Sequence, residues 1–207
     1  TSAVPALYGH QVAISVTIVL LLMMLNLRGL RESASFLLFP VYTFILVISL
    51  LIVVGLYNIV TGAVPLQATA LPGAAVPGIS IALILRAFSS GSSSLTGVEA
   101  ISNAVPFFKK PRAKNAAATL TMMALILGFF FVGITFINYW YGIVPEKEVT
   151  VLSQIGKAVF GHGILYYILQ FATALILAVA ANTGFSAFPV LAYNLAKDKF
   201  MPHMYQD

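Results

Sequence analysis

The residues best suited to chemistry lie together between Phe88 and Ala100, in the stretch F-S-S-G-S-S-S-L-T-G-V-E-A. Its hydroxyl groups and the Glu99 carboxylate are hard oxygen donors, which suit an alkali cation or a proton. The stretch contains no His or Cys, the side chains that a transition metal would prefer. Thr96 precedes Glu99 by three residues, so the two side chains share one face if this segment is helical. We therefore predict a cation or proton site at Thr96 and Glu99.

The chain that carries this stretch has the composition of an integral membrane protein. It is 60% hydrophobic and 8% charged, whereas a soluble domain is roughly a quarter charged. Several long apolar runs are separated by short polar loops, which predicts an all-α membrane domain. The absence of cysteine excludes disulfides and thiolate metal sites. The spans contain no nucleophile–base pair or metal motif, so we expect neither an enzyme nor a cofactor.

The hydropathy pattern divides the chain into five spans within a single transmembrane domain covering residues 1–207. A short surface helix is also expected before the last span, because Val149, Leu152, Ile155 and Val159 have helical spacing. The predicted spans are about 12–27, 36–59, 79–105, 116–141 and 164–193.

The third span is predicted to be broken near residues 89–94. A helix rises about 1.5 Å per residue, so residues 79–88 would cross only about half of a hydrocarbon core roughly 30 Å thick. Serine and glycine lower helix propensity, and unwound backbone in a membrane lines a cavity or lies within protein. A discontinuous helix of this kind is typical of transporters. The alternative is a packing face of small residues. The residues expected to line the unwound segment are Ser89, Ser90, Gly91, Ser92, Ser93 and Ser94.

Glu99 has a functional and a structural interpretation. A charge in the middle of a membrane costs several kcal/mol by most estimates, and such residues usually serve ion or proton pathways. The structural alternative is a salt bridge with Arg86 on the other half of the span. Farther along, Asn182, Thr183 and Ser186 form a polar face that would line an inward cavity or serve helix packing.

The basic residues predict the orientation of the chain. Eight of them follow the first, third and fifth spans, and the opposite side has only Lys147 and Lys157. The positive-inside rule then places Thr1 outside and Asp207 in the cytoplasm. The cluster K-K-P-R-A-K at residues 109–114 has a second interpretation, which is binding to anionic lipid head groups. The charge therefore indicates a membrane surface and not nucleic acid. The eight residues are Arg28, Arg31, Lys109, Lys110, Arg112, Lys114, Lys197 and Lys199.

Three stretches resemble the amino acid/polyamine/organocation (APC) superfamily. The segment F-S-S-G-S-S-S-L-T-G-V-E-A-I-S-N-A-V-P-F-F-K-K-P resembles transmembrane helix six of that superfamily, and most of all that of the KimA potassium importers, relatives of the KUP family. L-N-L-R-G-L-R-E-S is similar to the turn between helices four and five. A-A-N-T-G-F-S-A-F-P-V-L-A-Y-N-L-A-K-D-K-F-M-P is similar to the end of helix eight and the loop after it.

The resemblance implies a LeuT/APC-type bundle of two inverted five-helix repeats, with the five spans as helices four to eight and helix six broken. It implies that Thr96 and Glu99 bind potassium or couple it to protons. We expect the chain to be a fragment that lacks helices one to three and nine onward. The resemblance also implies a missing C-terminal domain that binds cyclic di-AMP and forms a homodimer.

The function expected from this resemblance is potassium import across the cell membrane by a multi-pass, proton-coupled symporter. Its partners would be potassium, protons, the lipid bilayer and the rest of the same chain. Two alternatives stay open. One is a proton-coupled amino acid permease, in which a half-helix end holds the substrate carboxylate. The other is a membrane scaffold or sensor that transports nothing, in which Thr96 and Glu99 would tolerate substitution.

Overall fold

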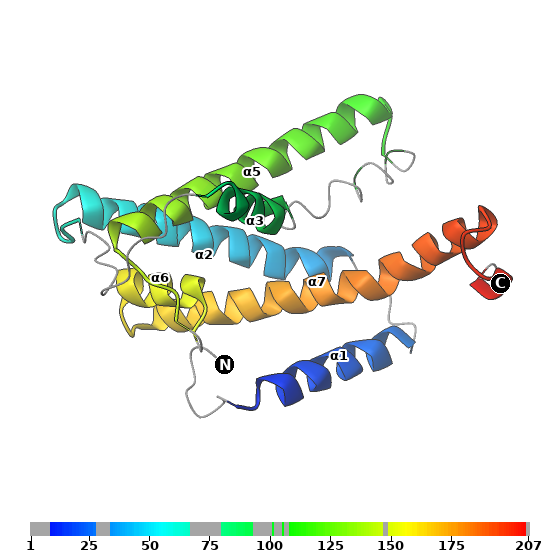
Figure 1. The fold of residues 1–207 in the computed structure, drawn as a ribbon, viewed down its shortest axis with the longest axis horizontal. Helices are drawn as coiled ribbons and strands as arrows, with labels where there is room; N and C mark the ends of the chain where they lie inside the picture. Colours follow the sequence, from blue (N-terminus) through cyan, green and yellow to red (C-terminus); the bar gives the residue numbers. More distant parts are fainter. Residues whose placement is uncertain are drawn as a thin grey trace. The chain divides into compact units, whose positions relative to one another are not determined.

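The computed structural model describes residues 9–27, 34–66, 80–92, 101, 105, 108–146 and 149–205. The described part of the chain contains helices and turns and no strand, so the predicted all-α fold is confirmed. The α-helices are α1 (Gln11–Leu27), α2 (Ala34–Val60), α3 (Ile81–Ser92), α5 (Arg112–Trp140), α6 (Val151–Phe160) and α7 (Ile164–Lys197), and a 3₁₀ turn, η4, covers His203–Tyr205 (Figure 1).

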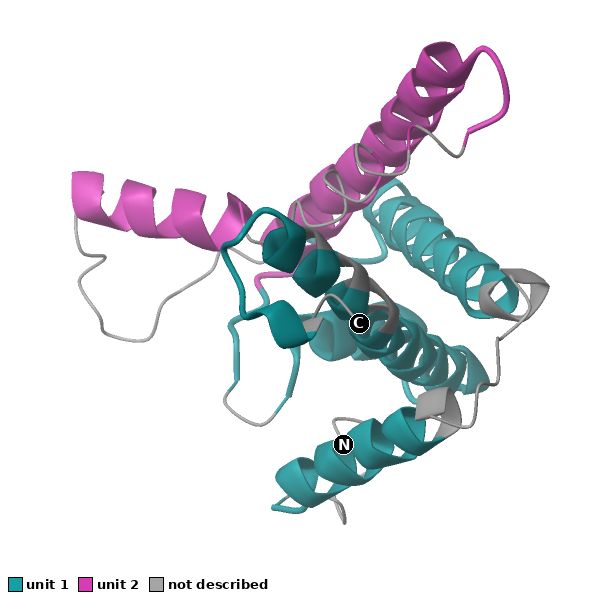
Figure 2. Ribbon diagram, turned by 90° about the vertical axis from the view of Figure 1, so that its right-hand side faces the viewer, with its two compact units in different colours: residues 1–65, 143–207 teal, residues 66–142 magenta. Residues whose placement is uncertain are grey.

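The chain forms two compact units (Figure 2). Unit 1 comprises Thr1–Pro65 and Ile143–Asp207, and it contains α1, α2, α6, α7 and η4. Unit 2 comprises Leu66–Gly142 and contains α3 and α5. The predicted cation site belongs to unit 2 by its position in the sequence.

Helix α7 is the centre of unit 1. It contacts α1, α2, α6 and η4, and α2 and α6 also contact each other. In this core, Ile48 and Leu51 of α2 and Ile155 of α6 are fully or almost fully buried, as are Leu169 and Ala172 of α7. Most other large apolar side chains on the helices are exposed. Such exposure on apolar helices is expected where lipid or further helices replace water.

Helix α7 contains an internal proline and ends in a tight turn. Pro189 has no N–H to donate and its ring crowds the carbonyl of residue 185, which bends a helix. Figure 1 shows α7 bending in its orange part. After its last residue, Phe200 N donates to Leu195 O at 2.8 Å and Lys199 N donates to Ala196 O at 3.0 Å. This pattern is a Schellman motif with Lys199 in the left-handed position, at φ 64°.

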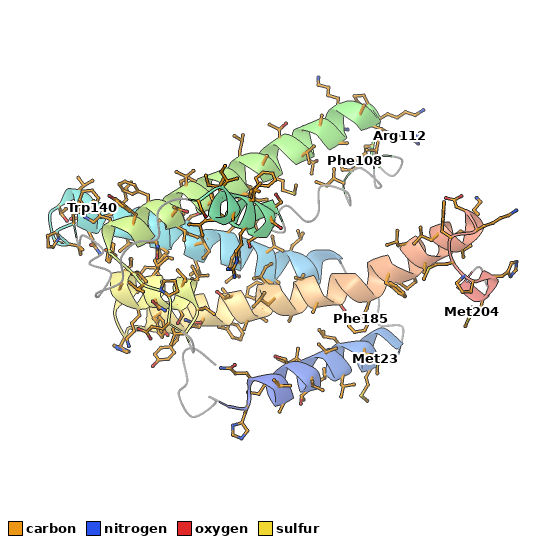
Figure 3. All side chains as sticks on the ribbon, in the orientation of Figure 1. Met23, Phe108, Arg112, Trp140, Phe185 and Met204 are labelled. Carbon is orange, nitrogen blue, oxygen red and sulfur yellow. The ribbon has the colours of Figure 1, made fainter. Side chains whose placement is uncertain are left out.

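In unit 2, α5 is a helix of 29 residues and α3 one of 12. The first turn of α5 is basic, and its other end is aromatic, with Tyr139, Trp140 and Tyr141. Helix α3 has no buried residue. Figure 3 labels Arg112 at one end of α5 and Trp140 at the other.

Helices α1, α2, α5 and α7 have bounds near those of four predicted spans, whereas α3 covers only the first part of the third. Three of the described helices are long and apolar enough to cross a membrane. These are Leu38–Val60, Arg112–Trp140 and Ile164–Asn182, with mean hydropathies of 2.6, 2.4 and 2.1. The α1 helix has 17 residues and therefore reaches about 26 Å, at the short limit for a span. Helix α7 extends four residues beyond the predicted end at 193, because no helix-breaking residue occurs between Tyr193 and Lys197.

Candidate functional site

The first half of the predicted cation site is helical. The sequence predicted a break beginning near residue 89, but α3 continues through Ser89, Ser90, Gly91 and Ser92. The prediction of unwound backbone at these four residues is therefore wrong. A single serine or glycine costs a helix only about 0.5–1 kcal/mol relative to alanine, and the preceding apolar turns are already formed. A Cβ on Gly91 would have no atom within 4 Å among the described residues, so this glycine is not required by close packing there.

The second half of the predicted site lies outside the described residues. This part includes Ser93, Ser94, Thr96 and Glu99, so their roles stay predictions. Arg86, the alternative salt-bridge partner of Glu99, lies in α3 and is exposed. In α3, Arg86 and the three serines lie in the last seven residues, about two turns, after the apolar start I-A-L-I-L.

A shallow apolar groove lies in the same stretch of α7 as the residues of the predicted polar face, and none of those residues is among the ones that line it. Asn182 of α7 is half-buried. The side chains of Thr183 and Ser186 are not among those that the structure describes. The groove is lined by Ala181, Gly184, Phe185, Phe188 and Pro189. Because these side chains are apolar, the groove favours packing by another helix over binding of a polar solute. The role of Asn182, Thr183 and Ser186 stays a prediction.

The structure brings together a buried polar cluster between α6 and α7 that the sequence did not predict. Ser153 Oγ and Tyr166 OH are 2.9 Å apart, and Gln170 Nε2 donates to Ser153 Oγ. Ser153 is 2% exposed and Tyr166 is 4% exposed. All three polar groups are thus paired inside an otherwise apolar contact, as buried polar groups must be to avoid a large desolvation cost.

Local sequence explains why α6 forms at this place. Thr150 is the N-cap, and its hydroxyl accepts a hydrogen bond of 3.4 Å from Ser153 N. Gln154 Nε2 donates to Val149 O at 3.2 Å, which fixes the chain as it enters the helix. Gly161 follows at φ 67°, a left-handed conformation that glycine adopts without strain. The short G-H-G turn then brings α7 back against α6.

The predicted amphipathic face of α6 is confirmed in part. Ile155 and Val159 are buried as expected. Ser153 and Gly156 are buried as well, which an apolar periodicity alone does not reveal. Gly156 was the available signal, because a glycine within an amphipathic helix marks a place where another element approaches closely. The cluster contains two hydroxyls and one amide and no acid or base, so its chemistry is that of holding two helices together.

Comparison with known proteins identifies the family. A family model described as amino acid permease matches residues 2–207. The chain belongs to this amino acid permease family. The predicted membership of the APC superfamily is thereby confirmed, and this permease-family chain is part of a multi-pass membrane protein.

One curated relative of this permease-family chain is "Potassium transporter KimA" of Bacillus subtilis (strain 168). The two are 54% identical over 207 residues, which cover 99% of this chain and 34% of the relative. The chain thus spans about a third of the length of that relative. The match includes the stretch from Phe88 to Ala100, because nearly the whole chain is aligned.

Proposed function

We propose that the full-length protein imports potassium across the cell membrane and that protons drive the import. The observation that carries this proposal is the 54% identity, over 99% of the chain, to a protein named as a potassium transporter. The membrane-spanning helices and the permease family are consistent with transport. In this proposal the helices belong to a bundle of two inverted five-helix repeats.

Within this proposal, Thr96 and Glu99 bind potassium or couple it to a proton. Their hydroxyl and carboxylate are oxygen ligands of the kind that an alkali cation accepts. Helix α3 supplies the preceding part of the site, since its last turn ends at Ser92, four residues before Thr96. We place the break of the span after Ser92, where carbonyl oxygens at a helix C-terminus favour a cation.

The test of this function is uptake by cells that lack other potassium importers and express the full-length protein. Uptake of radiolabelled rubidium, driven by an imposed proton gradient, is expected. Abolition of that uptake by a protonophore supports the coupling to protons. Rubidium uptake that is equal in cells with and without the protein contradicts the proposal.

A second candidate is a proton-coupled amino acid permease, which the description of the matching family favours. In that case a half-helix end holds the substrate carboxylate, and Glu99 serves as a proton relay or binds the amine. Uptake of labelled amino acids without uptake of rubidium would establish this candidate. A scaffold that transports nothing predicts neither uptake, with normal growth after substitution of Thr96 and Glu99.

The proposal includes an orientation and further partners. Thr1 lies outside and Asp207 in the cytoplasm, in accord with the excess of basic residues on one side. A C-terminal cytoplasmic domain of the longer protein forms a homodimer and binds cyclic di-AMP. Labelling of single cysteines by an impermeant maleimide tests the orientation. A cysteine at Lys157 should react in intact cells, and one at Lys110 only after the membrane is opened.

A further inference from the structure

Four cationic side chains gather at the start of α5. Lys109, Lys110, Arg112 and Lys114 fall within six consecutive residues, and all four are exposed. The same end carries Phe108, which is half-buried. Figure 3 labels Phe108 and Arg112 at this end of the helix. We call residues 108–114 the basic turn.

Hydrogen bonds hold the backbone of the basic turn in a folded arrangement. Asn115 Nδ2 donates to Lys109 O at 2.9 Å. Asn115 N donates to Pro111 O at 3.1 Å, and Phe108 N donates to Val105 O at 3.2 Å. The four cations are therefore displayed from a fixed turn, which reduces the entropy lost when they bind an anion together.

The length of α5 gives the depth of the basic turn in a membrane. The helix has 29 residues and is therefore about 43 Å long. A hydrocarbon core is about 30 Å thick, and about 40–45 Å with its head groups. Tyr139 and Trp140 at the other end are of the type that sits at the membrane surface. With that end in one head-group layer, the basic turn lies in the opposite one.

Among the residues that the structure describes, no acidic group balances the charge of the basic turn. None of the four cations has an ion-pair partner within the described ranges, and the first turn of α5 has no acidic residue. The described residues of unit 2 include no Asp or Glu. A cluster of cations at the depth of lipid phosphates needs anions from the membrane.

We propose that the basic turn binds the head groups of anionic phospholipids in the leaflet that it faces. The cations supply charge-assisted hydrogen bonds to the phosphates, and Phe108 lies beside them at the edge of the acyl chains. This inference goes beyond the proposed function and is independent of it, because it requires only that α5 spans the membrane.

The test uses the full-length protein in nanodiscs with one tryptophan as a reporter. Phe108→Trp, with every native Trp including Trp140 replaced by Phe, places the reporter in the basic turn. A second protein keeps only Trp140, at the far end of α5. Quenching by brominated phosphatidylglycerol is compared with quenching by brominated phosphatidylcholine. At position 108 we expect an apparent affinity for phosphatidylglycerol that is about fivefold or more above that for phosphatidylcholine. At Trp140 we expect no preference between the two lipids.

Two charge variants form a matched pair. Lys109→Gln with Lys110→Gln removes two charges from the basic turn, and Lys197→Gln with Lys199→Gln removes two from the end of α7. Only the first pair should lower the preference for phosphatidylglycerol at position 108. Replacing all four cations of the basic turn should abolish that preference. Cysteine labelling checks that each variant keeps its orientation. Equal effects of the two pairs, or a preference that survives loss of all four cations, would overturn the proposal.

Discussion

Gly156 of α6 packs directly against the side chain of Leu169 of α7, at a separation that leaves no room for a Cβ. Leu169 is 1% exposed, so other atoms surround it. Next to this contact, Ser153 bonds to both Tyr166 and Gln170 of α7. The α6–α7 junction therefore combines close backbone approach with a paired polar cluster, and both features can be tested separately.

Gly156→Ala should destabilise the full-length protein. The added methyl group forces Leu169 out of its position, and overpacking of this kind costs about 1–3 kcal/mol. That cost exceeds the roughly 1 kcal/mol that alanine gains over glycine in a helix. Gly163→Ala is the matched control, since its Cβ would meet Phe160 O at an ordinary 3.5 Å. Of the two glycine variants, only Gly156→Ala should lower the thermal unfolding temperature in detergent. Adding Leu169→Ala to Gly156→Ala should reduce that loss.

Removal of hydroxyls from the polar cluster should have unequal effects. Ser153→Ala leaves both the Tyr166 hydroxyl and the Gln170 amide without their partner, and should cost about 1–3 kcal/mol. Tyr166→Phe leaves the Ser153–Gln170 bond in place, and should cost about 1 kcal/mol. The unfolding midpoints of the two variants, measured in the same detergent, show which one loses more stability. A larger loss for Tyr166→Phe would show that the cluster is not centred on Ser153.

Lys199→Gly should stabilise the end of α7. Lys199 has φ 64°, and a left-handed conformation costs a residue with a Cβ about 1–2 kcal/mol. Glycine adopts it without that cost and is the usual residue at this position of a Schellman motif. Lys197→Gly, at the last residue of α7, should instead destabilise by up to about 1 kcal/mol. Hydrogen exchange of the last turn of α7 distinguishes the two effects locally.

Thr96→Val tests whether the Thr96 hydroxyl binds the transported cation. The change removes one oxygen and nearly preserves shape, so the apparent affinity for rubidium should fall while the maximal rate falls less. The measurement is full-length uptake over a rubidium concentration series at equal membrane expression. Thr96→Ser is the control, since it keeps the hydroxyl and should retain most of the affinity. Wild-type affinity in the valine variant would remove Thr96 from the proposed site.

Glu99→Gln tests whether potassium and a proton compete for one carboxylate. The amide keeps the size and an oxygen but cannot change its charge. We expect loss of concentrative rubidium uptake and a flattened pH dependence of the flux that is left. Detergent melting of the same variant separates this role from a salt bridge with Arg86, which predicts a lower melting temperature and an unaltered pH profile. Uptake like that of the wild type would leave Glu99 without the proposed role.

The membrane helices could be predicted from the sequence because their signal is local. Apolar runs as long as Leu38–Val60 and Arg112–Trp140 have few alternatives to a spanning helix. Their ends were predicted less well, because caps and breaks depend on differences of about 1 kcal/mol per residue. Ser89 to Ser92 illustrate this limit, since their weak helix propensity did not end α3 at the predicted place.

The α6–α7 cluster could not be predicted for a different reason. Ser153 and Gln170 are 17 residues apart, and they meet only after the turn at Gly161 folds α7 back along α6. Neither residue is unusual in its own segment, and hydrophobic periodicity treats Ser153 as a polar position. The amphipathic face of α6 was predictable from its periodicity, whereas the residues of α7 against which it packs depend on the tertiary fold.

The close packing between α6 and α7 also offers a means to follow movements of α7 in the full-length protein. Ala158 and Lys157 lie on the exposed side of α6, away from the buried Ser153 and Gly156. A spin label or fluorophore at Ala158 would leave the junction intact and would be carried by α7 as one rigid piece. A distance measured from that label to a distant helix would report the displacement of α7, whose residues Ile164–Asn182 are long and apolar enough to cross a membrane.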